Sequence, residues 1–263
     1  MRLYLGYRLL PALCVLLLAC STQSSWKEET GDVLRDIIVK EANWAMQQQP
    51  ITVTSSYCER SAGDLHDFYS EGDYWWPDPD NPDGAYIRKD GQTNPDNFVD
   101  HRLAMIRFSK VVGALTSAYL LTEDEEYVKH AFIHIEAWFA DTTTLMNPNL
   151  LYAQAIKGVT TGRGIGIIDT IHLMEVAQGI IRMQDAECVD PEKLKAIKKW
   201  FADYLRWLTT HKNSIDEMNA KNNHGTCWVM QVASFAKLTG DNELLELCRS
   251  RYKNILLPAQ MAE

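Results

Sequence analysis

Apolar residues recur at helical spacing along most of the chain after residue 29. In residues 30–48, for example, Val33, Ile37 and Trp44 fall on one face of a helix, and Pro50 ends the pattern. The same periodicity predicts helices over residues 98–121, 164–183, 191–211, 225–238 and 241–256, and another that runs from a capping segment at 122–125 to residue 140. The pattern therefore predicts an all-α chain.

Short turns join the successive predicted helices, and Leu-Thr-Gly-Asp at 238–241 is one of them. Neighbouring helices that are linked in this way form helical hairpins. Repeated hairpins with long apolar faces favour an α/α toroid, in which inner and outer helices alternate around a central cleft. The predicted repeat is structural, because the sequence itself does not repeat.

Two long stretches, residues 55–97 and 142–163, lack this periodicity. The first is rich in proline, glycine, tyrosine and acidic residues, which predicts a loop. A loop of this length inside a compact domain is usually functional or disordered. Aromatic side chains need partners and favour an ordered, functional loop; those in this stretch include Tyr69, Tyr74, Trp75, Trp76 and Tyr86.

The start of the chain has the pattern of an export signal. Arg2 and Arg8 precede an apolar run over residues 9–19, which is too short for a permanent membrane span and suits a signal peptide. Leu-Leu-Ala-Cys at 17–20 has the pattern of a lipobox, which predicts a lipidated Cys20; an ordinary signal peptide that is cut near Ala19 is the alternative. We therefore expect an exported protein of a Gram-negative bacterium, in the periplasm or held at the outer membrane by its lipid.

This reading divides the chain into a signal peptide at 1–20, a polar tether at 21–29 and one toroid domain at 30–263. Cys58, Cys188, Cys227 and Cys248 lie within that domain, widely spaced and without a Cys-x-x-Cys pair, so no zinc site is predicted. Export permits disulfides, but the spacing gives no pairing. Four reduced, buried cysteines are the simpler prediction.

The formal net charge of −9 limits the partners. No basic stripe is present that could displace counterions from a phosphate backbone, so the composition argues against nucleic acid. A polyanionic substrate would have to meet a local group of cations. We expect such a group to converge on one cleft; its members are Arg88, Lys89, Arg163 and Lys221.

Aromatic and cationic residues of the first stretch could bind sugar. Tyr-Trp-Trp-Pro-Asp-Pro at 74–79 could stack on the apolar faces of sugar rings, and the alternative is a loop that buried tryptophans pin to the body, above all Trp76. Arg88 could form a forked pair with a uronate carboxylate. The simpler alternative is that Asp90 pairs with Arg88 across a turn.

The segment Lys-Asn-Asn-His-Gly-Thr at 221–226 precedes an apolar helix and carries the sharpest chemical signal. β-Elimination of a uronate polymer removes the C5 proton next to a carboxylate whose charge has to be neutralised. Asn223 could bind that carboxylate, and His224 could act as the base near neutral pH. The alternative is that Asn222 or Asn223 only caps the helix and His224 is a satisfied surface residue.

Paired carboxylates that hydrolyse a glycosidic bond are the rival chemistry. The candidates are Asp64, Asp67, Asp73, Asp78, Asp216 and Glu217. So many acids make any one pair unspecific, and solvated loop charge is the alternative for all of them. Gly-Arg-Gly-Ile-Gly at 162–166 imitates a phosphate-binding loop, but no predicted strand precedes it, so no nucleotide site is predicted.

Taken together, ordered segments over about residues 55–260 resemble the alginate lyase family of polysaccharide lyases, which have α/α toroid folds. The segments are YWWPDP at 74–79, YIRKDGQTNP at 86–95, LTEDEEYVKHAFIHIEAWF at 121–139, MNPNLLYAQAIKG at 146–158, GRGIGIIDT at 162–170 and NNHG at 222–225. Their common order makes the resemblance far more specific than any one of them.

The resemblance implies roles for individual residues. The family's Asn-His pair falls on Asn223 and His224, where Asn223 would neutralise the carboxylate and His224 would assist removal of the proton. The sugar-binding residues would be Tyr74, Trp75, Arg88, Gln154, Arg163 and Asn222. Such lyases need no organic cofactor and no metal is implied at the reacting sugar; the partner would be an acidic polysaccharide such as alginate or a glucuronan.

The family's pattern continues beyond the equivalent of Leu257-Pro258 into a segment with an arginine and a tyrosine, which serves as the acid. The sequence ends at Glu263 without that segment, so we expect an incomplete toroid, truncated at its C-terminus. Tyr252 lies nearby, but its helical context does not match. The prediction is a lyase; a toroid glycoside hydrolase and a non-catalytic, glycan-binding surface lipoprotein are the alternatives.

Overall fold

A computed structural model describes residues 26–261 of the chain. The predicted signal peptide and Cys20 lie outside these residues, so export and lipid anchoring stay predictions. Helix α1 (Trp26–Ala45) crosses the boundary between two compact units, the first ending at Arg35 and the second beginning at Asp36. In the first unit, Arg35 pairs with Asp32 across one turn of α1 at 3.4 Å. The second unit contains all the remaining elements.

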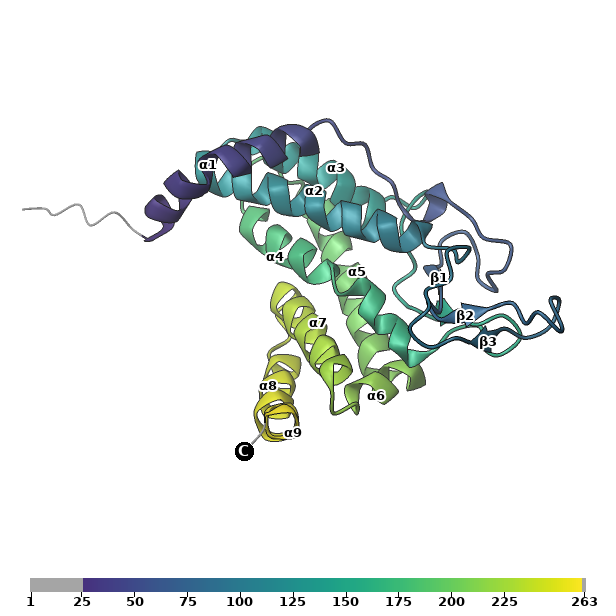
Figure 1. Cartoon of the computed structure of the whole chain (residues 1–263). Helices are drawn as coiled ribbons and strands as arrows, with labels where there is room; N and C mark the ends of the chain where they lie inside the picture. The colour runs from purple at the N-terminus through teal and green to yellow at the C-terminus, as the bar shows by residue number, and fades with distance from the viewer. Residues whose placement is uncertain (1–25, 262–263) are drawn as a thin grey trace, which may run out of the picture. The chain divides into compact units, whose positions relative to one another are not determined.

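Most of the second unit is helical, as the periodicity predicts (Figure 1). After α1 the helices are α2 (Asp100–Thr122), α3 (Glu125–Phe139), α4 (Leu173–Met183), α5 (Pro191–Thr210), α6 (Lys212–Met218), α7 (Asn223–Thr239), α8 (Asn242–Arg251) and α9 (Leu257–Gln260). Tighter or wider helical turns form η1 (Val53–Ser55), η2 (Gly164–Thr170) and η3 (Tyr252–Leu256). In this part of the chain α2 packs on α3 and α7 packs on α8 as helical hairpins, whereas α5 packs on α7 and α3.

Local signals set the ends of these helices. Asp124 and Asp190 cap α3 and α5, each accepting a hydrogen bond from a backbone amide of the first turn (3.0 and 2.9 Å). Pro191 follows Asp190 as the first residue of α5, where its missing N–H costs nothing. The chain turns at the end of α7 through Gly240, with a φ of 78° that glycine adopts without strain.

The hairpins stack so that helices of the same direction contact one another. Helix α4 contacts α2 and α7, and α3 contacts α5, which gives an inner row and an outer row. This is the arrangement of an α/α toroid. Because alternate helices point the same way, α2, η2 and α7 all begin at one end, the end at which strands β1, β2 and β3 lie (Figure 1).

The two predicted irregular stretches are ordered; they are called here the first loop (55–97) and the second loop (142–163). Strand β1 (Tyr69–Glu71) of the first loop pairs in parallel with β4 (Tyr152–Ala155) of the second. Within the first loop, β2 (Trp75–Trp76) pairs with β3 (Ile87–Arg88) in antiparallel register. The pairing of β1 with β4 fixes the two loops to each other.

Aromatic rings form much of the core between the helices. Phe139 of α3, Trp200 and Phe201 of α5 and Phe235 of α7 lie with neighbouring ring centroids 4.4, 4.9 and 5.1 Å apart. Such tilted pairs stabilise a core beyond the area that they bury, by about 0.5–1.5 kcal/mol each. They hold the outer helices against α7.

A buried polar network fixes η2 beneath the loops. Thr170 donates to Gln231 Oε1 (2.9 Å) and lies 2.8 Å from the Tyr204 hydroxyl, while Gln231 Nε2 donates to the carbonyl of Ile167 (2.9 Å). Thr170, Tyr204 and Gln231 are fully buried. Because buried polar groups are costly unless paired, this network specifies the position of η2 against α5 and α7.

The single helix predicted over 164–183 is wrong. Residues 164–170 form the tight turns of η2, which meets α4 at an angle of 44°. A Cβ at Gly166 would come 2.4 Å from the Cβ of Ala153, so η2 lies directly on β4. The periodicity also missed α6, which is too short to show an apolar repeat.

All four cysteines of this part of the chain are free; Cys188 is half-buried and the others are buried.

Two glycines test how tightly the loops pack. Gly158 and Gly91 have φ values of 74° and 72°. A Cβ at Gly158 would come 2.6 Å from the Cα of Ala85 in the first loop, whereas one at Gly91 meets nothing within 4 Å.

We expect Gly91→Ala to lower the free energy of unfolding by about 1–2 kcal/mol, the cost of the left-handed backbone. Gly158→Ala should cost about 1–3 kcal/mol more, since backbone must shift. Urea unfolding measures both, and equal losses would contradict the close packing.

Candidate active site

The first loop is anchored by an ion pair on one face of β1, between the exposed Arg60 and the buried Glu71. Arg60 donates two hydrogen bonds to Glu71, both 2.6 Å long, and the amide of Phe98 donates a third at 2.7 Å. Burial raises the pKa of Glu71, but the hydrogen bonds from Arg60 and Phe98 outweigh it and hold the pKa below its usual value. Side chains alternate along a strand, so Ser70 points to the other face of β1.

On that other face lies Asp169 of η2, which is only 5% exposed. Ser70 Oγ donates to it at 2.5 Å, Gln154 Nε2 donates at 3.2 Å, and Arg102 Nε lies 3.5 Å away. Burial raises the pKa of Asp169, against the pull of Arg102 and the two hydrogen bonds. One carboxylate therefore joins the first loop, the second loop, η2 and α2.

Gln154 adopts a conformation that is rare for its residue type, with a φ of 55°. Its amide N–H donates to Ser70 Oγ (2.8 Å), and its side chain donates to Asp169. Arg163 Nε donates to the Gln154 carbonyl (3.0 Å), and a terminal nitrogen of Arg163 donates to Gln154 Oε1 (3.2 Å). Strain of this kind persists where the surroundings fix the backbone from several sides, and here it holds the guanidinium of Arg163.

Arg163 is half-buried and bonds to neutral partners. Among residues 26–261, no carboxylate oxygen lies within 4.0 Å of its guanidinium. Burial lowers the pKa of Arg163, and the nearby charge of Arg88 lowers it further; Asp169, Asp73 and Glu217 act more weakly in the other direction. The arrangement leaves a partly desolvated cation that an anion could neutralise.

An aromatic ring and a second cation lie beside Arg163. Trp75 and Arg88 are directly paired across β2 and β3, so they share one face of that ribbon. A Cβ at Gly72 would come 2.7 Å from Trp75 and 2.8 Å from Arg163, which places both side chains against the same backbone. Tyr74 is 40% exposed at the edge of the same turn. Trp75, Arg88 and Arg163 therefore lie together.

Side chains on the opposite face of the ribbon contact other residues of the first loop. Trp76 Nε1 donates to the Gln92 carbonyl at 2.8 Å, and Lys89 lies over the Trp76 ring, 5.0 Å from its centroid. The expectation that Lys89 converges with Arg88 and Arg163 is thus wrong, because alternate residues of a strand face opposite ways. Arg88 also pairs with Asp90 at 2.7 Å, as the simpler alternative predicts, and both side chains are well exposed.

The Asn-Asn-His segment begins α7. Asn222 caps the helix, its Oδ1 accepting from the amide of His224 at 3.1 Å, and Asn223 follows as an exposed first residue. His224 Nδ1 lies 2.9 Å from Oε2 of Glu217 on α6. Glu217 in turn packs on Gly164, where a Cβ would come 3.4 Å from its Cγ. Since Gly164 adjoins Arg163, His224 and its partner lie next to the second loop.

Carboxylates that could have hydrolysed a glycosidic bond already have structural partners. Asp67 accepts from Asn147 (2.8 Å), Asp73 pairs with Arg102 (2.9 Å), and Asp216 pairs with Lys212 (2.8 Å). Asp64 and Asp78 accept backbone amides of their own turns (2.9 and 3.0 Å), and Glu217 holds His224. In the described part of the chain, no group of three or more His, Cys, Asp or Glu side chains could hold a metal ion.

Comparisons with known proteins agree with this geometry. A model of the alginate lyase family matches residues 52–263. The chain belongs to the alginate lyase family. A crystal structure of an alginate lyase from Bacteroides ovatus matches with a TM-score of 0.81 and 33% sequence identity, over 90% of this chain and 65% of that one. The match confirms the predicted helical α/α toroid, and this chain spans less than two thirds of that alginate lyase.

A crystal structure of alginate lyase A1-III from Sphingomonas species A1 matches with a TM-score of 0.47 and 14% identity, over 82% of this chain and 56% of that one. The search of curated proteins found no match.

The sequence analysis did not identify the residues that hold the candidate site together. Ser70, Arg102 and Asp169 are ordinary polar residues in the sequence, and only the folded chain brings them to one point. Glu217 was noticed as a possible hydrolytic acid, not as a partner of His224. A carboxylate seven residues before a histidine could have suggested a contact between successive helices, but α6 itself was not predicted.

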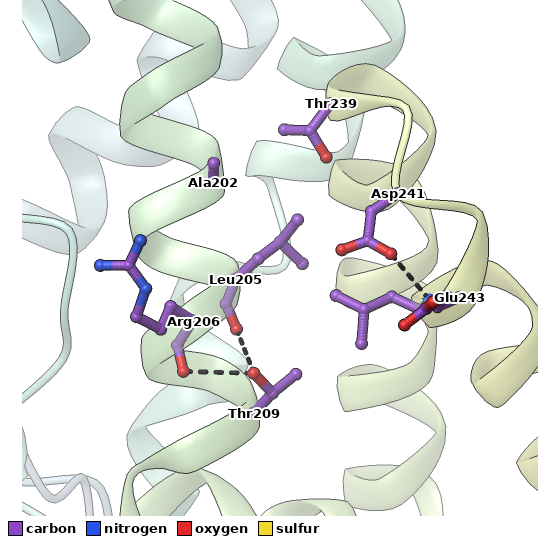
Figure 2. Close-up of a pocket in the computed structure, with 8 residues that line it drawn as sticks. Ala202, Leu205, Arg206, Thr209, Thr239, Asp241 and Glu243 are labelled. Atoms are coloured by element: carbon purple, nitrogen blue, oxygen red, sulfur yellow. Dashed lines mark hydrogen bonds between the residues drawn. The ribbon is translucent and has the colours of Figure 1, made fainter.

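A separate hollow of about 430 Å³ lies between α5 and the α7–α8 turn (Figure 2). Thr239, which lines it, is at the opposite end of α7 from His224. Its polar groups serve their own helices: Thr209 donates to carbonyls of α5, and Asp241 caps α8 through the amide of Leu244 (3.0 Å). This hollow is therefore not part of the candidate site.

The buried acid Asp169 makes a pH-dependent contribution to stability that can be tested. Its pKa is raised on folding, so its contribution is largest below about pH 4, the usual pKa of Asp, and is lost as pH rises through the folded value. We expect the unfolding free energy of wild type minus that of Asp169→Asn to fall as pH rises above about 4. Denaturant unfolding at several pH values measures this difference. Asp216→Asn is the exposed control, and a difference for Asp169→Asn that grows with pH would contradict the assignment.

Proposed function

We propose that this alginate lyase family member cleaves an acidic, uronate-containing polysaccharide by β-elimination. The observation that supports it most is Arg163, a half-buried cation with neutral partners beside an aromatic ring and a histidine–carboxylate pair. A uronate offers the matching features, an apolar ring face for Trp75 and a carboxylate for a cation.

In this proposal each residue has a defined part. Arg163 and Asn223 bind the carboxylate at C5, which lowers the cost of negative charge on the ring. His224 takes the C5 proton, and the electron pair of that bond forms the C4–C5 double bond while the C4–O bond breaks. The departing oxygen takes up a proton, and we assign no described residue to donate it. Tyr74, Trp75 and Arg88 bind neighbouring sugars.

Two of the earlier candidates take different parts. Gln154 accepts two hydrogen bonds from Arg163, through its carbonyl oxygen and its Oε1, and its own Nε2 donates to Asp169, so it acts on the sugar through Arg163. Asn222 is occupied as a helix cap, and its contact with sugar stays a prediction. The proposal that Cys20 anchors the protein at the outer membrane fits a polysaccharide substrate, which is met outside the cell.

Replacing His224 tests the reaction type. We expect His224→Ala to lower the rate of formation of unsaturated uronate ends, followed by their ultraviolet absorbance, by at least about 100-fold. His130→Ala is the control, since His130 lies on α3, where it contacts the Gln48 carbonyl (3.1 Å) and the ring of His134. Shortening of the polymer without unsaturated ends would instead indicate hydrolysis. Binding without any product would indicate a glycan-binding protein.

Replacing Arg163 tests the carboxylate site. A charge-assisted hydrogen bond contributes about 1.5–3 kcal/mol, so Arg163→Ala should lower kcat/KM on uronate polymers by roughly 10- to 100-fold. Arg163→Lys keeps the charge without the fork and should recover part of the loss. Arg206→Ala, at an exposed position on α5, is the control. An Arg163→Ala protein with unchanged kinetics would exclude Arg163 as the carboxylate ligand.

A further inference from the structure

Glu217 is the one carboxylate near the reacting residues whose partner is an imidazole. Its Oε2 lies 2.9 Å from His224 Nδ1, and the two side chains are 9% and 23% exposed. Among residues 26–261, His224 Nε2 makes no hydrogen bond. The contact thus occupies one ring nitrogen and leaves the other free.

The chemistry of the pair follows from this geometry. An ionised carboxylate only accepts hydrogen bonds, so Nδ1 must carry the proton in the contact. A neutral imidazole has a single N–H, and its lone pair then lies on Nε2. Nε2 is therefore the basic nitrogen, and a proton taken there produces an imidazolium whose charge the adjacent carboxylate balances.

Local packing holds Glu217 in this position. Its Cγ lies against Gly164, and the turn between α6 and α7 is closed by Arg251, which donates to the carbonyl of Met218. A Cβ at Gly225 would come 2.0 Å from the Ala220 carbonyl oxygen, so the start of α7 cannot move away from that turn without breaking the packing. The distance between Glu217 and His224 is thus set by the backbone of two helices.

We propose that Glu217 is a positioning residue, which holds His224 in the Nδ1–H tautomer and so presents Nε2 as the base. This inference rests on the proposed function for its catalytic consequence, whereas the tautomer is a property of the protein without substrate. It distinguishes Glu217 from the neighbouring acid Asp216, which is exposed and pairs with Lys212 at 2.8 Å.

Other charges around the pair act in known directions. Burial raises the pKa of Glu217, while His224 and, from the second loop, Arg163 favour its ionised form; Asp216 opposes ionisation from the same helix. Burial raises the pKa of the Cys227 thiol on α7, and the nearby charge of Glu217 raises it further. The pair therefore lies between a cation of the second loop and an acid of its own helix.

Nitrogen NMR of His224 tests the tautomer directly, with His224→Gln to assign the signals. We expect Nδ1–H in wild type and in Glu217→Gln, whose carbonyl oxygen can still accept, and a shift toward Nε2–H in Glu217→Leu. Asp216→Asn, the matched control that removes one acid from the same helix, should leave the tautomer unchanged. A wild-type Nε2–H tautomer, or one that Glu217→Leu does not alter, would overturn the proposal even in an active lyase.

Kinetics test the consequence. We expect kcat/KM at neutral pH to fall by at least about 100-fold in Glu217→Leu and by less in Glu217→Gln. Asp216→Asn, the matched control, should leave kcat/KM close to the wild-type value. A Glu217→Gln protein as inactive as His224→Ala, with an unchanged tautomer, would make Glu217 itself the reacting group and overturn the inference. If wild type has the Nδ1–H tautomer and forms no unsaturated product, the proposed function fails while the positioning of His224 stands.

Discussion

Asp169 is almost wholly withdrawn from water, and a carboxylate in that position needs partners from within the protein. It finds them in Ser70 of the first loop, Gln154 of the second loop and Arg102 of α2. If any one of these three partners moved away, the buried carboxylate of Asp169 would lose a favourable contact. The strained backbone of Gln154, and through it the position of Arg163, therefore depends on one buried acid. Together with the Arg60–Glu71 pair and the pairing of β1 with β4, this acid orders two loops of irregular sequence.

The helical hairpins supply the frame on which this constraint acts. Because α2, η2 and α7 begin at the same end of the fold, residues far apart in the sequence reach one place. Arg102 comes from the first turn of α2, Asp169 from η2 and His224 from the first turn of α7. The buried contacts of Thr170 with Tyr204 and Gln231 fix η2 relative to α7. Stability of the core and geometry of the site are thus linked through a single short segment.

The sequence predicted what depends on periodicity and missed what depends on tertiary contact. The long helices α2, α5 and α7 follow from apolar spacing, and Asp190 and Asn222 follow from cap chemistry. Residues 164–170 have a helical apolar pattern, yet the contact of Gly166 with Ala153 and the demands of Asp169 impose tighter turns. Glu217 could not be paired with His224 from sequence, because the pairing depends on the angle at which α6 meets α7. The sequence predicted that Arg88 and Lys89 face the same cleft. Adjacent residues of an extended segment point to opposite faces, so their side chains lie apart.

Under the proposed function, an acidic protein binds an acidic polymer and has to concentrate its positive charge where water is scarce. Arg88 is close to Arg163 but is exposed and paired with Asp90, so water and that acid screen most of its field. Arg163 is half-buried, and within residues 26–261 its hydrogen-bond partners are amide oxygens, so its charge is less screened. An anion there relieves both its desolvation and its repulsion from Arg88. We infer that discrimination in favour of a carboxylate arises at Arg163, whereas Arg88 attracts the polymer from further away. The formal net charge of −9 disfavours acidic ligands on average, so a local cation can make their binding selective without a basic surface.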